Sequence, residues 1–243
     1  ALTYLETLSF EGPQLEYLAG RDEFDPGFID WLADLEFAGD VRAMPEGTPV
    51  FPNEPLLEVE GSLPVAQLAE TVIMNQVHMQ TVLASKALRV KQAAGERSVV
   101  DFGLRRMHGA DAGLKAARAF HIAGVDATSN VLAGQVWGVP VTGTMAHSYI
   151  QSHADEMEAF RAFTETYPET ILLVDTYDTL EGVRNVVRLA EELGDGFRVR
   201  GVRLDSGDLG ALAKRTREIL DQAGLRGVEI FASGGLDEYE IDR

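Results

Sequence analysis

His147 is the side chain in this sequence that is best suited to phosphoryl or acid–base chemistry. It lies in the segment Gly143-Thr-Met-Ala-His147-Ser148, directly after a short apolar run and at the expected start of a helix. Small residues allow a ligand to approach the backbone closely, and helix-terminal amides favour bound anions. An imidazole there could be a general acid, a phosphate acceptor or a ligand. The alternative is a buried histidine that bonds to a neighbouring carbonyl.

Two pairs of carboxylates follow two other apolar runs. Asp205 and Asp208 flank a Ser-Gly turn, and Asp175 and Asp178 flank Thr-Tyr. The first pair could accept hydrogen bonds from the two hydroxyls of a ribose, or hold Mg²⁺ through water. The second pair allows the same interpretation. Alternatively, these carboxylates simply cap the helices that follow.

An adjacent basic pair, Arg105 and Arg106, lies in the one stretch, residues 96–121, where basic residues outnumber acidic ones. The pair follows an expected strand and a glycine, so a guanidinium there could bind phosphate or carboxylate. Two solvated loop arginines paired with Asp101 and Asp111 would explain the pattern equally well.

Six short apolar runs alternate with helical patterns and would position these residues. The runs are Ser98–Phe102, Ala123–Ala127, Val139–Gly143, Ile171–Asp175, Gly201–Asp205 and Val228–Ala232. Successive βα units predict a parallel sheet, either a barrel or a doubly wound sheet. Polar residues gather at the carboxyl ends of all six runs, where a (β/α) barrel carries its active site. Because such a barrel normally closes with about eight units, we expect an irregular or incomplete α/β barrel.

The first 95 residues follow a different pattern, typical of a smaller α+β module. Helical spacing is present over Leu2–Ser9 and Pro26–Phe37, and one long amphipathic helix is expected over Gln67–Ala94. Strand-like runs lie between them, at Val41–Met44, Pro49–Phe51 and Leu56–Val59. We therefore expect two domains, the α+β module over residues 1–95 and the partial barrel over residues 96–243.

The composition excludes several classes of function. The formal net charge of −18 disfavours nucleic acids and anionic membranes as partners. The absence of cysteine excludes disulfides, thiolate metal sites and a cysteine nucleophile. No apolar run approaches the roughly 20 residues of a membrane span, and Ala1–Ser9 lack the pattern of a signal peptide. A cytoplasmic location is the expectation.

Five motifs occur in order along the second part of the chain. They are Phe102-Gly-Leu-Arg-Arg106 with His108-Gly109, Asp126-Ala-Thr-Ser-Asn-Val-Leu-Ala-Gly134, Gly143-Thr-Met-Ala-His-Ser148, Val174-Asp-Thr-Tyr-Asp-Thr179 and Val202-Arg-Leu-Asp-Ser-Gly-Asp-Leu209. Together they resemble the nicotinate phosphoribosyltransferase family, whose fold is of the type II phosphoribosyltransferase kind. Met44-Pro-Glu-Gly47 and Glu54-Pro-Leu-Leu57 fit the β module of that family.

The resemblance implies that nicotinate and phosphoribosyl pyrophosphate give nicotinate mononucleotide and pyrophosphate, in NAD salvage. It implies Mg²⁺, coupled hydrolysis of ATP as a co-substrate, and a homodimer. His147 would be the histidine phosphorylated by ATP, and Asp205 would lie near the ribose and its metal. Thr144 would contact nicotinate. The other expected substrate-binding residues are Arg105, Arg106, Ser148, Asp175, Ser206, Gly207, Ser233 and Gly234.

Members of the resembled family are longer at both ends. We expect this chain to lack the N-terminal tyrosine that stacks on the pyridine ring and the C-terminal glycine-rich loop that holds the 5′-phosphate. Ala232-Ser-Gly-Gly235 also lacks the asparagine expected after the serine. The activity of this stretch alone is therefore in question.

Two other functions are carried as alternatives. One is a related phosphoribosyltransferase that acts on nicotinamide or quinolinate. The other is a non-catalytic ligand-binding fragment. An aldolase-type barrel is discounted, because its Schiff-base lysine should lie at a strand end, where none of the four lysines lies.

Overall fold

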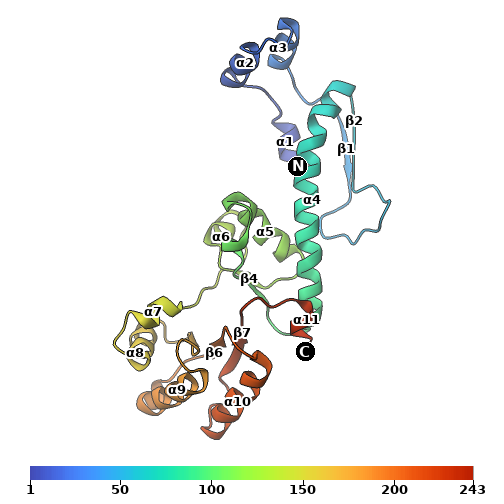
Figure 1. Cartoon of the computed structure of the whole chain (residues 1–243). Coiled ribbons are helices and arrows are strands. Elements are labelled where there is room, and N and C mark those ends of the chain that lie inside the picture. Colours follow the sequence, from blue (N-terminus) through green and yellow to red (C-terminus); the bar gives the residue numbers. More distant parts are fainter. Residues whose placement is uncertain (243) are drawn as a thin grey trace. The chain divides into compact units, whose positions relative to one another are not determined.

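The computed structural model describes residues 1–242 and divides into two compact units (Figure 1). The first unit contains residues 1–88 and 105–125, and the second contains residues 89–104 and those from 126 onward. The expected boundary between residues 95 and 96 stays a prediction. No helix in residues 1–242 is long and apolar enough to cross a membrane.

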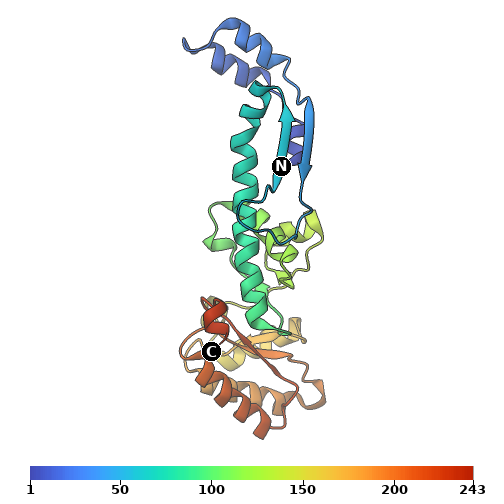
Figure 2. The same ribbon diagram turned by 90° about the vertical axis from the view of Figure 1, so that its right-hand side faces the viewer.

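The first unit is built from helices and one two-stranded sheet. Its helices are α1 (Leu2–Glu6), α2 (Gly12–Ala19), α3 (Pro26–Ala33), most of α4 (Leu63–Ala94) and α5 (Ala110–Ile122). Strands β1 (Gly39–Ala43) and β2 (Leu57–Gly61) pair antiparallel. Figure 2 shows this hairpin beside the first half of α4. Val41 and Val59 pack there against buried Ala69 and Ile73, so apolar contact holds the sheet to the helix.

Two elements of this unit differ from the sequence prediction. Residues 49–51, expected as a strand, are irregular, because the prolines at 49 and 52 have no amide hydrogen to donate to a ladder. Helix α2 was not expected. It is short, but Glu11 and Gln14 form a capping box that satisfies its first amides.

The strands of the second unit are all parallel, which confirms the prediction of a mixed α/β fold. Strand β3 (Val100–Asp101) pairs with β4 (Ala127–Thr128). A second sheet has the order β5 (Ile171–Leu173), β6 (Gly201–Leu204), β7 (Glu229–Ala232). The helices are α6 (Val131–Trp137), α7 (His147–Gln151), α8 (Glu156–Thr166), α9 (Thr179–Leu193), α10 (Leu209–Gln222) and α11 (Glu238–Ile241), with a 3₁₀ turn at Gly194–Gly196. A second 3₁₀ turn, Leu104–Arg106, begins in the second unit, and its last two residues belong to the first.

The expected strand Val139–Gly143 is reduced to a single bridge between Val141 and Thr128. Pro140 lies within this run and has no amide hydrogen, which limits the ladder. The described residues therefore form two separate parallel sheets rather than one continuous barrel wall.

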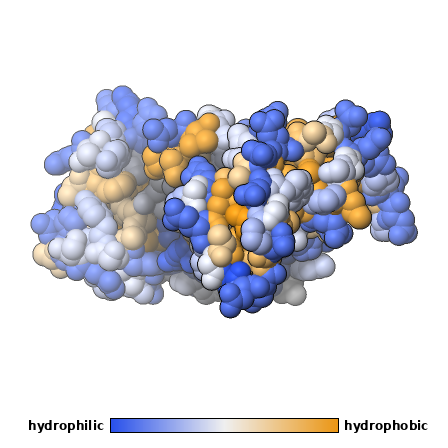
Figure 3. Space-filling model, turned by 90° about the horizontal axis from the view of Figure 1, so that it is seen from above, coloured by the Kyte–Doolittle hydropathy of each residue, from blue (hydrophilic) through white to orange (hydrophobic). Residues whose placement is uncertain are grey.

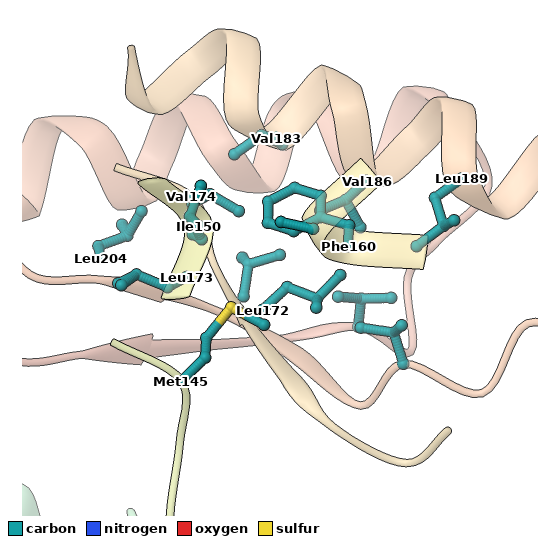
Figure 4. Close-up of a cluster of buried hydrophobic side chains, with 14 of the residues drawn as sticks. Met145, Ile150, Phe160, Leu172, Leu173, Val174, Val183, Val186, Leu189 and Leu204 are labelled. Carbon is teal, nitrogen blue, oxygen red and sulfur yellow. The ribbon is translucent and has the colours of Figure 1, made fainter. Parts of the chain in front are cut away.

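The main core of the second unit lies between the sheet β5–β6–β7 and its helices (Figure 4). Leu172 on β5, Phe160 on α8 and Val186 on α9 are fully buried there. A Cβ added at Gly182 would collide with the carbonyl oxygen of Val174, so α9 lies very close to the end of β5. This close packing fixes the loop between them, residues 174–178.

The surface carries apolar side chains as well as charges. On the face shown in Figure 3, apolar residues (orange) are interspersed with hydrophilic ones (blue). Large exposed apolar side chains include Tyr17, Phe51 and Leu63 in the first unit and Val131 in the second.

Candidate active site

His147 begins helix α7 and faces two polar groups from the loops that follow β5 and β6. Its Nδ1 lies 3.2 Å from the Thr176 hydroxyl oxygen, and its Nε2 lies 3.6 Å from Asp205 Oδ2. The imidazole side chain is 39% exposed. Polar groups therefore lie beside both ring nitrogens, and the ring is still accessible to solvent. This differs from the alternative of a buried histidine that bonds to a carbonyl.

Asp205 follows strand β6 and is held by three side chains. Its Oδ1 accepts a hydrogen bond from the Ser233 hydroxyl at 2.5 Å and lies 3.3 Å from Arg203 Nη2. Partial burial raises the pKa of this carboxyl group, but the Ser233 hydrogen bond, the Arg203 charge and His147 together outweigh it. The pKa of Asp205 therefore lies below its ordinary value, and the group is a carboxylate at neutral pH.

Asp175 follows strand β5 and connects the two strand ends. Its Oδ2 accepts hydrogen bonds from the Asp205 amide at 2.9 Å and from the Ser206 hydroxyl at 2.6 Å. Its other oxygen, Oδ1, is buried without a hydrogen-bond partner. Because a buried carboxylate oxygen is costly to leave unpaired, this atom is a candidate contact for a ligand.

Two glycines shape the backbone around Asp205. Gly207 has a φ of +81° and Gly234 a φ of +105°, a region that side-chain-bearing residues rarely adopt. A Cβ at Gly234 would also collide with the carbonyl oxygen of Asp205. Gly234 therefore lets the turn after β7 approach the turn after β6, which brings Ser233 to Asp205.

Thr144 and Ser148 lie on either side of His147 in the chain. The Thr144 hydroxyl oxygen is buried without a hydrogen-bond partner, as Asp175 Oδ1 is. Ser148 is exposed in the first turn of α7. Their roles toward substrate stay predictions.

Arg105 and Arg106 end a 3₁₀ turn and are exposed. Both belong to the first unit, whereas His147, Asp175 and Asp205 belong to the second. The expected contact of this basic pair with the substrate anions stays a prediction.

The structure separates the carboxylates that the sequence left undecided. Asp178 accepts the Glu181 amide at 2.8 Å and caps α9, and Asp208 accepts the Ala211 amide at 3.0 Å and caps α10. The capping interpretation is therefore right for the second member of each pair. The first members, Asp175 and Asp205, bond instead to the site's own backbone and side chains.

Two residues of this cluster were missed in the sequence. Arg203 donates from Nη1 to the Met145 carbonyl at 3.2 Å, and its Nε is buried without a partner. It lies two residues before Asp205, so strand alternation places both on one face, and that signal could have found it. Thr176, the partner of His147, carries no comparable signal, because only the tertiary structure brings it there.

No group of three or more His, Asp or Glu side chains arranged to hold a metal is found within residues 1–242. The carboxylates of the site are thus too few to enclose a metal ion fully. A metal here would keep water or substrate oxygens among its ligands.

The sequence matches known families along nearly its whole length. Residues 1–78 match the nicotinate phosphoribosyltransferase (NAPRTase) N-terminal domain, and residues 97–238 match the nicotinate phosphoribosyltransferase (NAPRTase) family. Nicotinate phosphoribosyltransferase pncB2 of Mycobacterium tuberculosis is 55% identical over 238 residues, which are 98% of this chain and 51% of that protein.

Solved structures agree with these matches. The crystal structure of human nicotinic acid phosphoribosyltransferase has a TM-score of 0.91 and 32% identity, covering 100% of this chain and 60% of that one. Nicotinate-nucleotide pyrophosphorylase from Pyrococcus furiosus has a TM-score of 0.74 and 36% identity, covering 84% and 53%. The chain spans about half the length of the curated relatives it matches. On these matches the chain belongs to the nicotinate phosphoribosyltransferase family.

Proposed function

We propose that this protein transfers the phosphoribosyl group of phosphoribosyl pyrophosphate to nicotinate, giving nicotinate mononucleotide and pyrophosphate in NAD salvage. The observation that carries the proposal is the cluster of His147, Asp205 and Asp175 at the carboxyl ends of β5 and β6. This cluster leaves buried oxygens of Asp175 and Thr144 without partners, ready for a ligand. Membership of the family supports the identity of the substrates.

The reaction requires no protein nucleophile at the anomeric carbon of the ribose. The pyridine nitrogen forms a bond to the anomeric carbon of the ribose as the bond from that carbon to pyrophosphate breaks. The protein then contributes mainly by orienting the reactants and neutralising developing charge. We place Asp205 toward the ribose, where its carboxylate favours the positive charge that develops at the anomeric carbon. Ser206, Gly207, Ser233 and Gly234 form the turns around it.

The donor set of this site fits Mg²⁺. Asp205 and Asp175 supply hard carboxylate oxygens, and Asp175 Oδ1 has no other partner. Mg²⁺ is usually held by one or two carboxylates together with water and substrate phosphates. When bound, it would neutralise charge on the departing pyrophosphate.

His147 is proposed to accept a phosphoryl group from ATP. A bond forms from a ring nitrogen to the γ-phosphorus as the bond from that phosphorus to its bridging oxygen breaks, releasing ADP. Thr176 and Asp205 orient the imidazole. A phosphate on His147 would place new negative charge beside the Asp205 carboxylate, which would alter the electrostatics of the site.

We also propose that the two parallel sheets are parts of one incomplete barrel. Phe102, directly after β3, packs edge-on against Phe231 of β7 with ring centroids 6.3 Å apart. The expected homodimer, which rests on the family resemblance, and the expected cytoplasmic location belong to the same proposal.

The test is release of pyrophosphate by this chain from phosphoribosyl pyrophosphate and Mg²⁺, with nicotinate as the variable substrate, with and without ATP. Nicotinate-dependent release that rises with ATP would establish the transferase activity, whereas no release would mean that this stretch alone is not an enzyme. His147→Ala should abolish the ATP stimulation, because the phosphoryl acceptor is gone, while Ser152→Ala at the opposite end of α7 should not. Saturable binding of phosphoribosyl pyrophosphate without any release would support the non-catalytic alternative instead.

A related transferase with a different acceptor, nicotinamide or quinolinate, stays the alternative. A site that pairs the carboxylate of nicotinate should reject the neutral amide. The same assay with nicotinamide or quinolinate in place of nicotinate decides between them. Turnover of either at the expense of nicotinate would contradict our choice of substrate.

A further inference from the structure

A cavity of about 330 Å³ lies between the first turns of α8 and α9, apart from the His147 cluster. It is lined by Ala154, Asp155, Glu156, Tyr177, Asp178, Glu181 and Asn185. None of these residues takes part in the proposed transfer reaction. Four of the seven are acidic, which alone would describe only two capped helix ends.

Glu156 is the feature that capping does not explain. It is only 7% exposed, and its Oε2 accepts a hydrogen bond from Asn185 at 2.7 Å. Its Oε1 is buried and has no hydrogen-bond partner. Leaving a buried carboxyl oxygen without a hydrogen bond costs free energy. We therefore expect a molecule bound in the cavity that Glu156 lines to donate a hydrogen bond to this oxygen.

The other acidic groups show which atoms remain for a ligand. Asp155 and Asp178 each use Oδ1 to cap a helix, through the amides of Glu158 and Glu181. Glu181 is held by Arg184 and Arg188. The Oε1 atom of Glu156 is therefore the one acceptor of these four side chains that is buried without a donor, and the exposed caps Asp155 and Asp178 add negative charge beside it.

The residues that line the cavity indicate which kind of hydrogen-bond donor would fit it. Tyr177, which is 65% exposed, places an aromatic ring at the cavity, and Ala154 adds an apolar surface. A planar guanidinium has several N–H donors in a fixed fork and also stacks on aromatic rings. We propose that this cavity binds a guanidinium group carried on a short apolar stem.

The test is binding of butylguanidinium to the full chain, followed by isothermal titration calorimetry, with neutral butylurea as the matched ligand. We expect saturable binding of butylguanidinium and at least tenfold weaker binding of butylurea. Glu156→Gln should weaken butylguanidinium binding at least tenfold. Glu165→Gln, the same change on an exposed position of α8, should leave it unaltered.

Binding should also weaken at acid pH, because burial raises the pKa of Glu156 and a proton then competes with the ligand. The charged groups around Glu156 are Asp155, Asp175, Asp178, Glu181, Arg184 and Arg188. Tyr177→Ala changes an exposed ring, so it provides a second variant if Glu156→Gln fails to fold, and it should weaken binding severalfold.

Absence of saturable binding would overturn the proposal and assign the cavity to water only. Equal binding of butylurea, or unchanged binding by both Glu156→Gln and Tyr177→Ala, would also overturn it. The peptide acetyl-Gly-Arg-Gly-amide distinguishes the source of the group. Tighter binding of the peptide than of butylguanidinium assigns the site to an arginine of a polypeptide, and equal binding assigns it to a free small molecule. Because the readout is binding and not turnover, the result is independent of the proposed transferase activity.

Discussion

At the residue scale, two aspartates three positions apart have different environments. Asp178 caps a helix, as many aspartates at such positions do, while Asp175 bonds to the Asp205 amide and the Ser206 hydroxyl from the next strand. The difference follows from where each side chain lies relative to the sheet. A carboxylate at the strand end meets the neighbouring strand, and one three residues later meets only its own helix.

Ser233→Ala should raise the pKa of Asp205, because it removes the hydrogen bond that favours the carboxylate. At present the pKa of Asp205 is lowered, so this group stabilises the fold above its unfolded pKa of about 3.9 and loses that contribution as the pH falls through its folded value. In the Ser233→Ala variant, the Asp205 carboxylate should therefore contribute less to the free energy of unfolding. Titration of the carboxyl carbon by NMR measures the change, and Ser152→Ala, whose hydroxyl bonds to Tyr149, is the control. An unshifted Asp205 would contradict the role given to Ser233.

Glu156 should show the opposite pH dependence. Burial raises its pKa, so its contribution to stability is present below the unfolded value of about 4.3 and is lost as the pH rises through the folded value. Glu156→Gln removes this titration, so the unfolding free energy of the variant should fall less between pH 4 and pH 7 than that of the unaltered chain. Urea unfolding at several pH values checks this, with Glu165→Gln as control. The prediction would be contradicted if the unfolding free energy changed with pH in the same way for the unaltered chain, Glu156→Gln and Glu165→Gln.

At the element scale, the approach of α9 to β5 depends on Gly182. A methyl group there would collide with the carbonyl oxygen of Val174, so Gly182→Ala must push the helix from the strand end. We expect a loss of about 1–3 kcal/mol in unfolding free energy, in the range for overpacking. The loop that carries Asp175 and Thr176 should shift as well.

Gly196→Ala is the matched control for that prediction. A Cβ at Gly196 meets no atom within 4 Å, so this substitution should change the unfolding free energy by less than about 0.5 kcal/mol. Chemical denaturation measures both variants. Equal stability of the two would show that α9 can relax without cost.

At the scale of the whole molecule, each unit has its own apolar core. One cluster contains Phe160 and Leu172 in the second unit, and another contains Leu32 and Leu35 in the first. Phe160→Ala should therefore cost about 3–5 kcal/mol in the second unit. Amide hydrogen exchange should show the loss of protection in β5 and β6, whereas Leu32→Ala should show it in α3. A Phe160→Ala protein with undiminished protection in β5 and β6 would contradict this assignment of the core.

The sequence by itself determined the family, the parallel α/β class and the position of β6 to within a residue. It could do so because apolar periodicity, capping aspartates and the order of the motifs are local properties. It misplaced the strand at residues 139–143, where Pro140 outweighed an apolar run, and it left Asp175, Asp178, Asp205 and Asp208 undecided.

Only the tertiary structure decided which side chains meet. His147 lies 29 positions from Thr176, and Asp205 lies 28 from Ser233, so no local pattern can pair them. Parallel strands bring those positions together because their carboxyl ends lie at one edge of the sheet, and Gly234 permits the closest approach. The same packing buries Glu156 with an oxygen unpaired, a property of the folded chain that its sequence does not show.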